Sequence, residues 1–360
     1  MSDTQDVQID PQDEDQGTPR WVPVLMLVLV VLVGVGIWQS GALDADTRVV
    51  VSRELRGIMG TTCKIDVLVP PGRKQQANEA IDRAEKEIRR IELTVSSWID
   101  ESEIGRLNRA KAGIEVPLSD ETLTLLRSAR EAYEITDGAF DVTCRPLIEL
   151  WRQAGHEGRL PTDEEIAAAR DASGWSQLEL GERSATKAKD TVRVDLGGIA
   201  KGYAIDRAGK TLYRLGIKSG QVDIGGDLRV FGTPPRAGSW TARVKDPRRT
   251  GMVARFTIRD RAVCTSGDYA RFVEIEGERF SHIIDPRTGR PVRGTASVTV
   301  IAPTARQADI WATALSVLGP KEGFARLKSA APDAEAMTIT GGDGTDPQFD
   351  RTDGFPELVE

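Results

Sequence analysis

The sequence predicts an α+β domain preceded by one N-terminal transmembrane helix. Two observations predict the domain: apolar residues recur at helical spacing in the first half of the chain, and short strands separated by Gly, Pro and Asp turns fill much of the second half. Because the strands are grouped between helices rather than alternating with them, an antiparallel sheet with packed helices is favoured. The third observation is an uncharged apolar run near the N-terminus, which predicts the membrane helix.

The composition is that of a folded protein without a nucleic-acid partner. The 360-residue chain is 39% hydrophobic, which is enough for a substantial core. The formal net charge is −7, and six acidic residues against Arg20 in the first twenty positions account for most of it. The remainder is nearly neutral and has no basic run, which excludes the usual electrostatic signature of nucleic-acid binding. The three cysteines fit no metal spacing and are interpreted as small buried hydrophobes: Cys63, Cys144 and Cys264.

The N-terminal region predicts membrane attachment. Residues 21–38, WVPVLMLVLVVLVGVGIW, carry no charge, and at ~1.5 Å per residue such a helix spans roughly the hydrocarbon layer of a bilayer. We therefore expect an acidic tail over 1–20, a transmembrane anchor over 21–38 and a polar linker over 39–56. A cleaved signal peptide is the alternative, because Ser40 and Ala42 are small residues at a spacing typical of processing.

The remaining elements follow in chain order. Residues 61–69 alternate as a strand should, and a long helix with apolar positions from Ala77 to Ile91 comes next. Ser119 is expected to cap another helix, and Thr162 with Glu165 forms a capping box for a third. Strands are predicted at 193–196, 221–224, 228–231, 241–244, 254–258, 262–265, 271–275 and 297–301, and helices at 304–318 and 321–329. The tail, 341–360, is expected to be a surface loop.

Two glycine turns are candidates for ligand binding. The stretch VDLGGIAKGYAID, residues 194–206, predicts a strand, a turn and a helix whose free N–H groups favour an anion. It matches neither the dinucleotide-binding pattern nor the phosphate loop. The stretch QVDIGGDLRVFG, residues 221–232, has a second glycine pair followed by Asp227. For each stretch alone, a plain turn or hairpin is the simpler interpretation.

The helix predicted from Thr304 carries a candidate metal site. Thr304 and Gln307 suggest a capping box, which fixes the register so that Asp309 and Thr313 lie one turn apart on one face. A carboxylate and a hydroxyl suit Mg²⁺, which prefers oxygen ligands and keeps positions open for waters and phosphates. A local hydrogen bond between the two side chains is the alternative.

Eight ordered runs resemble the ApbE family of FAD:protein FMN transferases. They are MGTTCKIDV, SSWIDESEIGRLN, GAFDVTCRPLIELW, VDLGGIAKGYAID, VDIGGDLRVFG, CTSGDYARF, SHIIDPRTGRPV and SVTVIAPTARQADIWATALSVLG. The resemblance implies an ApbE-like, T-fold-related domain, which we place at 57–340 and follow with the tail. It also implies an enzyme that takes FAD as substrate and uses Mg²⁺, with Mn²⁺ as the alternative ion. Such an enzyme transfers the FMN half of FAD to a threonine or serine hydroxyl of a target protein and releases AMP.

The resemblance assigns roles to positions of this chain. Those implied to contact FAD are Met59, Trp98, Ala139, Phe140, Asp141, Asp195, Lys201, His282 and Ile284. Those implied to hold the metal are Asp309 and Thr313, with backbone oxygen from Gly198 or Ala200.

The two residues implied to act at the transferred phosphate are His282 and Asp285. His282 is the candidate base for the acceptor hydroxyl, since an unperturbed histidine has a pKa of ~6.5. Asp285 could orient the imidazole ring or help to hold the metal. The alternative is a strand-end histidine whose ring only hydrogen-bonds a carbonyl group.

The resemblance also implies a location and a partner. We expect a single-pass protein of the bacterial inner membrane, its catalytic domain facing the periplasm, that modifies a subunit of a membrane electron-transfer complex. Two other functions stay open: an FAD pyrophosphatase that yields FMN and AMP, and a non-catalytic, membrane-tethered flavin-binding protein. The pair Asp309 and Thr313 argues against the second, because storing a flavin does not require a metal at its phosphates.

Overall fold

The computed structural model describes residues 24–29, 31–32, 46–234, 239–268, 272–341 and 347–359. The chain forms two compact units, Met1–Thr47 and Arg48–Glu360. In the first unit, residues 24–29 and 31–32 are helical. Within the described ranges, no helix combines the length and the apolar character needed to cross a bilayer. The predicted acidic tail and much of the predicted anchor over 21–38 lie outside the described residues, so both stay predictions.

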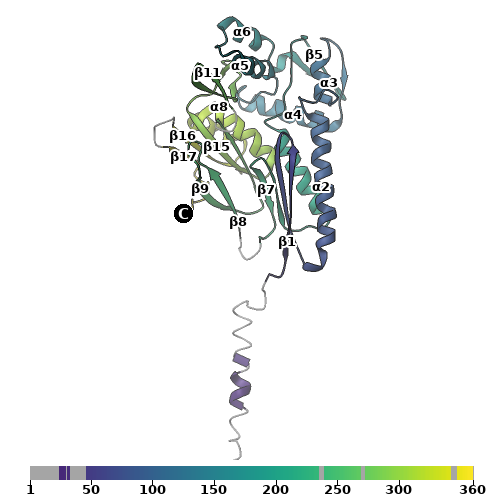
Figure 1. Ribbon diagram of the computed structural model, residues 1–360, viewed down its shortest axis with the longest axis vertical. Helices are drawn as coiled ribbons and strands as arrows, with labels where there is room; N and C mark the ends of the chain where they lie inside the picture. Colours follow the sequence, from purple (N-terminus) through teal and green to yellow (C-terminus); the bar gives the residue numbers. More distant parts are fainter. Residues whose placement is uncertain are drawn as a thin grey trace, which may run out of the picture. The chain divides into compact units, whose positions relative to one another are not determined.

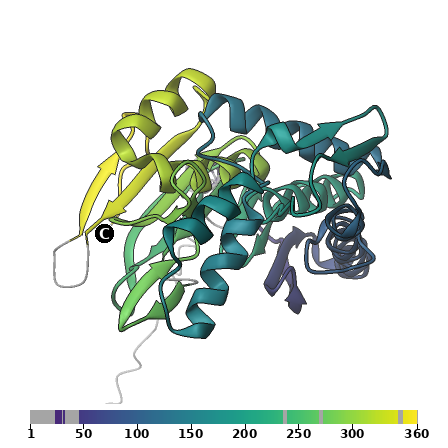
Figure 2. The ribbon, with the colours of Figure 1, turned by 90° about the horizontal axis from the view of Figure 1, so that it is seen from above.

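An eight-stranded antiparallel sheet organises the second unit (Figure 1). Its strand order is β1-β2-β6-β7-β10-β15-β16-β17, with β1–β2 at one edge and β16–β17 at the other (Figure 2). The strands are β1 (Val49–Ile58), β2 (Thr61–Val69), β6 (Gly220–Ile224), β7 (Asp227–Phe231), β10 (Ala262–Gly267), β15 (Thr295–Ala302), β16 (Glu335–Thr340) and β17 (Gln348–Arg351). The predicted α+β class with an antiparallel sheet is confirmed.

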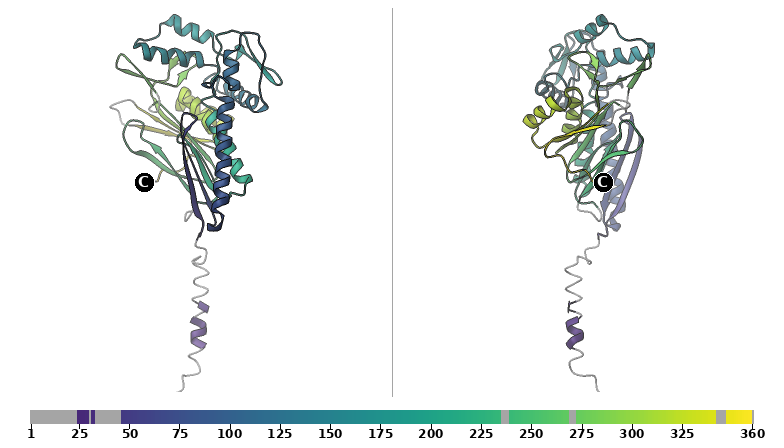
Figure 3. Two further views of the ribbon diagram at one scale, coloured as in Figure 1. Left: turned by 45° about the vertical axis from the view of Figure 1, so that its right-hand side comes forward. Right: turned by 90° about the vertical axis from the view of Figure 1, so that its left-hand side faces the viewer.

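Three helices cover one face of this sheet and enclose the main core. They are α2 (Lys74–Val95), α7 (Ala200–Arg214) and α8 (Ala305–Ala330), with α7 packed between the other two. Figure 3 shows α2 running along β1 and β2. The predicted apolar positions of α2, from Ala77 to Ile91, are all buried. The backbone of α8 leaves helical geometry at Gly319, where φ is 70°, and Pro320 follows. The two predicted helices at 304–318 and 321–329 are therefore the two parts of a kinked α8.

A hairpin covers the other face of the sheet. It consists of β8 (Trp240–Lys245) and β9 (Met252–Ile258), and it contributes to a second core. Phe256 of this hairpin contacts Phe355 edge to face, with ring centroids 5.0 Å apart. The contact holds the C-terminal segment against the hairpin.

The remaining elements frame the end of the domain opposite the start of β1, where α5 and α6 lie (Figure 1). Ser119 caps α4 and the capping box of Thr162 and Glu165 opens α6, as predicted. Apart from η1 (Pro71–Arg73), which joins β2 to α2 near the start of β1, these elements are α3 (Glu103–Arg109), β3 (Val116–Pro117), α4 (Asp120–Ile135), α5 (Arg145–Glu157), α6 (Asp163–Asp171), η2 (Trp175–Gln177), β4 (Leu178–Leu180), β5 (Ser184–Lys187), β11 (Phe272–Ile275), β12 (Glu278–Ser281), β13 (Ile284–Asp285) and β14 (Arg290–Pro291).

The structure corrects the predicted linker and the predicted tail. Residues 49–56, assigned to a linker, belong to β1, because an edge strand with one solvated face tolerates charged side chains such as Glu54 and Arg56. On the other face, Arg53 bonds Asp82 of α2. The tail 341–360 contributes β17 and the buried Phe355, so it completes the sheet rather than forming only a loop.

The predicted strand at 193–196 is also wrong. Only Arg193 makes a bridge, to Cys144. The side chain of Asn108 takes the place of a partner strand: its Oδ1 accepts from the amide of Val194 at 2.7 Å, and its Nδ2 donates to the carbonyl of Val194 at 2.9 Å. The residues that lead into the first glycine turn are thus held by an amide side chain.

Candidate active site

A buried ion cluster joins the start of α7 to β7 and α8. The ammonium of Lys201 bonds the carboxylate of Asp227 and lies 3.6 Å from Oδ1 of Asp309. Oδ2 of Asp309 accepts from the amide of Gly202 at 3.0 Å, which satisfies one of the free N–H groups at the start of α7. Oδ1 of Asp227 accepts from the amide of Thr265 at 2.9 Å. One lysine and two carboxylates therefore meet where three segments of the core converge.

The cluster has two carboxylates but only one ammonium group, so it is short of positive charge. Although burial opposes its charge, the carboxylates of Asp309 and Asp227 raise the pKa of Lys201, so the lysine stays protonated. Burial, reinforced by the charge of Asp227, raises the pKa of Asp309 to about 6 despite the opposing effect of Lys201. A carboxyl group whose ionised form is penalised in this way is one that an additional cation stabilises.

The glycine turn before α7 lies directly against α8. A Cβ on Gly198 would sit 3.0 Å from Oγ1 of Thr313 and 3.0 Å from Cε2 of Phe140. Only glycine fits this gap without displacing a neighbour. The turn, the hydroxyl of Thr313 and the ring of Phe140 are therefore in contact, and Ala200 begins α7 two residues later.

These residues fit a divalent cation of the oxygen-preferring kind. The carboxylate of Asp309, the hydroxyl of Thr313 one helical turn away, and the backbone of Gly198 or Ala200 provide hard oxygen donors. Among the described residues, no group of three or more His, Cys, Asp or Glu side chains could hold a metal by itself. Mg²⁺ bound by such donors usually keeps coordination positions for water or phosphate oxygens.

Asp195 anchors the loop on the other side of the glycine turn. Its carboxylate accepts from the amide of Gly197 at 2.7 Å and from the hydroxyl of Ser97 at 2.9 Å. The guanidinium of Arg145 lies 3.6 Å from the same carboxylate and donates to the carbonyl of Ser97 at 2.8 Å. Asp195 therefore shapes the turn and ties it to the loop that precedes Trp98.

Trp98 presents an open aromatic surface above two arginines. Its side chain is 60% exposed. The guanidinium carbons of Arg145 and Arg152 lie 4.5 Å and 5.1 Å from its ring centroid. Such stacking fixes the indole ring through cation–π attraction while leaving it accessible to a planar ligand.

The other positions implied to contact FAD lie on separate loops. Met59 lies in the β1–β2 turn with a positive φ of 48° and packs against the main core. Ala139 and Asp141 are buried, and Oδ1 of Asp141 accepts from both the amide and the hydroxyl of Thr143. Burial raises the pKa of Asp141 to about 6. In this structure Asp141 stabilises its own turn.

The segment with the histidine forms a short hairpin. His282 is exposed and follows β12, and Ile284 is buried and pairs with Pro291. The carboxylate of Asp285 accepts from Arg287 through both the backbone amide, at 2.9 Å, and the guanidinium, at 3.0 Å and 3.1 Å. Asp285 is thus engaged with Arg287, while His282 is accessible to a large partner.

Of the predicted residues, the structure brings together Gly198, Ala200, Lys201, Asp309, Thr313 and Phe140, and it joins Asp195 to the same turn. Sequence reasoning missed Asp227, Arg145 and Arg152. The only signal for Asp227 was its position after the second glycine pair. That pair does form the expected two-residue hairpin, with φ of 67° and 98° at Gly225 and Gly226.

The fold and the site define an α+β protein whose glycine turn, lysine and buried carboxylates suit a phosphate-bearing ligand together with a cation. Comparison with known proteins gives the family. The chain belongs to the ApbE family, whose model matches residues 59–338.

Curated relatives and solved structures agree with this assignment. The chain is 35% identical over 275 residues to the FAD:protein FMN transferase of Vibrio cholerae, covering 74% of this chain and 81% of the relative. It is 32% identical to that of Salmonella typhimurium, covering 73% and 77%. The crystal structure of the ApbE protein from Thermotoga maritima superposes with a TM-score of 0.75 at 33% identity, covering 85% of this chain and 98% of that one. The flavin transferase ApbE from Vibrio cholerae gives a TM-score of 0.70 at 32% identity, covering 84% and 97%.

Proposed function

We propose that this chain is an FAD:protein FMN transferase that attaches the FMN half of FAD to a threonine or serine hydroxyl of a target protein and releases AMP. The observation that carries the proposal is that the glycine turn at Gly198 lies against Thr313, one helical turn from Asp309 of the Lys201–Asp227–Asp309 cluster. It occurs in a chain whose family relatives carry that activity in their names.

The reaction needs one bond to form and one to break. The acceptor oxygen bonds to the phosphorus of the FMN half, and the bond from that phosphorus to the bridging oxygen of the diphosphate breaks. The bridging oxygen leaves with AMP. The hydroxyl proton is lost as its oxygen attacks, and we assign its acceptance to His282. The exposure of His282 allows a side chain of another protein to reach it.

The protein contributes mainly by positioning the diphosphate of FAD and by placing charged groups around it. A phosphate could approach the amide of Gly198 without an intervening Cβ, while the amide of Gly197 is held by Asp195 and fixes the turn. Lys201 holds the carboxylate of Asp309 in place. Mg²⁺, or Mn²⁺, held by Asp309, Thr313 and backbone oxygen of Gly198 or Ala200, would supply neutralisation of the diphosphate charge when bound.

One assay separates this function from its two alternatives. Protein, FAD and Mg²⁺ are mixed with and without a candidate acceptor, and both free AMP and denaturation-resistant flavin fluorescence on the acceptor are measured. Labelled acceptor with AMP supports the transferase. Release of AMP that is independent of the acceptor would establish a pyrophosphatase, and no AMP at all would establish a carrier.

The metal assignment is tested in the same assay with Asp309→Ala. Metal-dependent AMP release should disappear, because the variant lacks the carboxylate that is proposed to bind the metal. Asp350→Ala is the matched control, since Asp350 is exposed on β17, and it should behave as wild type. Full activity of Asp309→Ala would remove Asp309 from the metal site.

We also propose that the chain is anchored in the bacterial inner membrane by residues 21–38, with the domain in the periplasm and a subunit of a membrane electron-transfer complex as its target. The uncharged run supports the anchor. If the chain stays with membranes after alkaline carbonate treatment and keeps its N-terminal mass, the anchor is supported. A mature chain that begins after residue 42 would establish the cleaved signal peptide instead. Protease added to spheroplasts should degrade the domain if it faces the periplasm.

A further inference from the structure

One end of the domain gathers exposed basic side chains beside exposed apolar ones. Two segments form it: the β2–α2 connection, residues 70–76, and the end of α7 with its following turn, residues 210–219. Neither segment contains an Asp or a Glu. We call this surface the basal face, and its exposed members are Pro71, Arg73, Lys74, Lys210, Tyr213, Arg214, Leu215 and Lys218.

Direct contacts place the two segments side by side. Nε2 of Gln76 donates to the carbonyl of Leu215 at 3.2 Å. The ammonium of Lys218 lies 4.2 Å from the ring centroid of Tyr213. The first residue of β1, Val49, pairs with Val69 just before the β2–α2 connection. The chain therefore enters the domain at the basal face (Figure 1).

The stability of the fold explains only some of these charges: the helix dipole favours Arg214 in the last turn of α7, but it does not favour Arg73 and Lys74. Arg73 and Lys74 stand at the N-terminal end of α2, where the helix dipole disfavours positive charge. That helix has no acidic residue in its first turn and no side-chain cap. In the described part of the chain, none of the five basic residues of the basal face forms an ion pair. A charge arrangement that works against its own helix indicates an external anion.

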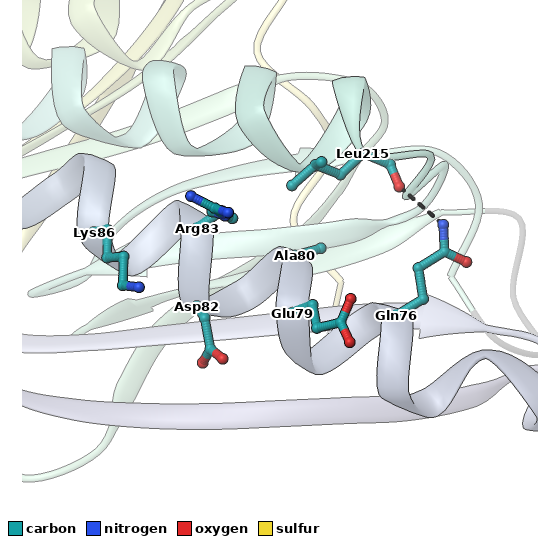
Figure 4. Close-up of a pocket in the computed structure, with 7 residues that line it drawn as sticks. All are labelled: Gln76, Glu79, Ala80, Asp82, Arg83, Lys86 and Leu215. Atoms are coloured by element: carbon teal, nitrogen blue, oxygen red, sulfur yellow. Dashed lines mark hydrogen bonds between the residues drawn. The ribbon is translucent and has the colours of Figure 1, made fainter.

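A groove lined by residues of both charges adjoins the basal face. The groove lies between α2 and the end of α7 and has a volume of about 520 Å³ (Figure 4). It carries Glu79 and Asp82 as well as Arg83 and Lys86, so its charges balance. The groove therefore adds no net charge to the basal face.

The mixture of residues on the basal face matches a lipid surface. Lys and Arg side chains reach headgroup phosphates while their stems and a tyrosine ring cover apolar surface. Tyr213 is 59% exposed and Leu215 is 39% exposed. From Trp38, at the end of the apolar run, the ten residue steps to Arg48 cover at most about 36 Å. A chain anchored by that run therefore keeps the basal face within reach of the headgroups.

We propose that the basal face docks on anionic phospholipid headgroups of the membrane that holds the N-terminal anchor. The inference rests on the proposed anchoring and adds an orientation to it. Lys201 and Leu215 lie at opposite ends of α7, about 20 Å apart at the helical rise per residue. With the basal face on the lipid, the ion cluster is raised above the membrane surface by about that distance.

The test is lysine footprinting of the full chain in lipid nanodiscs. One set of discs contains phosphatidylcholine only, and the other contains phosphatidylcholine with about one third phosphatidylglycerol. Lys74, Lys210 and Lys218 should react with an amine-acylating reagent roughly threefold or more slowly in the anionic discs. Lys321 and Lys328, exposed on α8, are internal controls that should not change. Half-molar salt should remove the protection by screening.

Charge-reversal variants complete the test. The double variant Arg73→Glu and Arg214→Glu should restore the reactivity of the three lysines in anionic discs. The matched double variant Arg183→Glu and Arg351→Glu, at exposed positions elsewhere, should not. Equal reactivity in both lipids, for a chain that co-purifies with the discs, refutes the docking and leaves the anchor standing.

Two further outcomes also refute the docking. A chain that does not co-purify with discs overturns the anchor and the docking together. Protection in both lipids that grows with protein concentration would place a second copy of the chain on the basal face.

Discussion

The contact between α7 and α8 yields the sharpest prediction. Gly202 packs so closely on the start of α8 that a Cβ there would lie 2.3 Å from the carbonyl oxygen of Ala305 and 2.7 Å from the amide of Arg306. The obstacle is backbone, which cannot turn aside as a flexible side chain can. Gly202→Ala must therefore push the two helices apart.

The expected loss of stability follows from three contributions. Replacing glycine by alanine inside a helix gains about 1 kcal/mol. Overpacking costs about 1–3 kcal/mol, and moving the amide of Gly202 away from the carboxylate of Asp309 removes a charge-assisted hydrogen bond of about 1.5–3 kcal/mol. Gly202→Ala should therefore lower the free energy of unfolding by about 1.5–5 kcal/mol.

Gly209 of the same helix provides the matched control. A Cβ at Gly209 would meet only Cδ of Arg229, at the ordinary contact distance of 3.8 Å. Gly209→Ala should gain about 1 kcal/mol from helix propensity alone. Chemical unfolding of both variants and wild type, in one detergent and followed by tryptophan fluorescence, measures the difference. Equal unfolding midpoints for Gly202→Ala and Gly209→Ala would refute the close approach of α7 to α8.

Three further predictions concern single side chains. Burial raises the pKa of Asp141 from 3.8 to about 6, so the charge of Asp141 costs stability above pH 6. Asp141→Asn should therefore be more stable than wild type by up to about 3 kcal/mol at pH 7.5 and equal to it near pH 4. A stability difference that does not change with pH would contradict the assigned burial. Burial lowers the pKa of Lys187 to about 8, and its ammonium donates to the carbonyls of Asn108 and Val192. Lys187 therefore loses its proton at a lower pH in the folded chain than in the unfolded chain, so wild type should gain stability over Lys187→Met as pH rises from 8 to 10. A difference in unfolding free energy that stays constant over this range would contradict the lowered pKa. His282→Ala should bind FAD as wild type does, measured by flavin fluorescence quenching, and transfer FMN about 10²–10⁴-fold more slowly, whereas equal transfer rates would make the histidine a scaffold residue.

The sequence was most informative where a side-chain pattern repeats. The helical spacing in α2, the caps at Ser119 and Thr162 and the strand at 61–69 all depend on residues close together in the chain, and the structure confirms them. It was least informative where a distant side chain replaces local pairing. The predicted strand at 193–196 failed because Asn108, 86 positions away, takes the hydrogen bonds of Val194.

The candidate site shows the same division. The spacing of Asp309 and Thr313 on one helix was visible in the sequence, and so was the glycine turn. The partner of Lys201 was not, because Asp227 reaches it only when β7 lies beside α7 in the folded sheet. Arg145 and Arg152 were missed because nothing in their local pattern distinguishes arginines that stack on a tryptophan from solvated ones.

The ion cluster also has a consequence for biogenesis. Its lysine bonds a carboxylate 26 positions further along the chain, and the neighbouring amide bonds one 107 positions away. Contacts of such long range form late, after the intervening strands have found their places. A chain still being synthesised therefore contains the glycine turn without the carboxylate of Asp309, and under the proposed function nucleotide cleavage can begin only once α8 has joined the core.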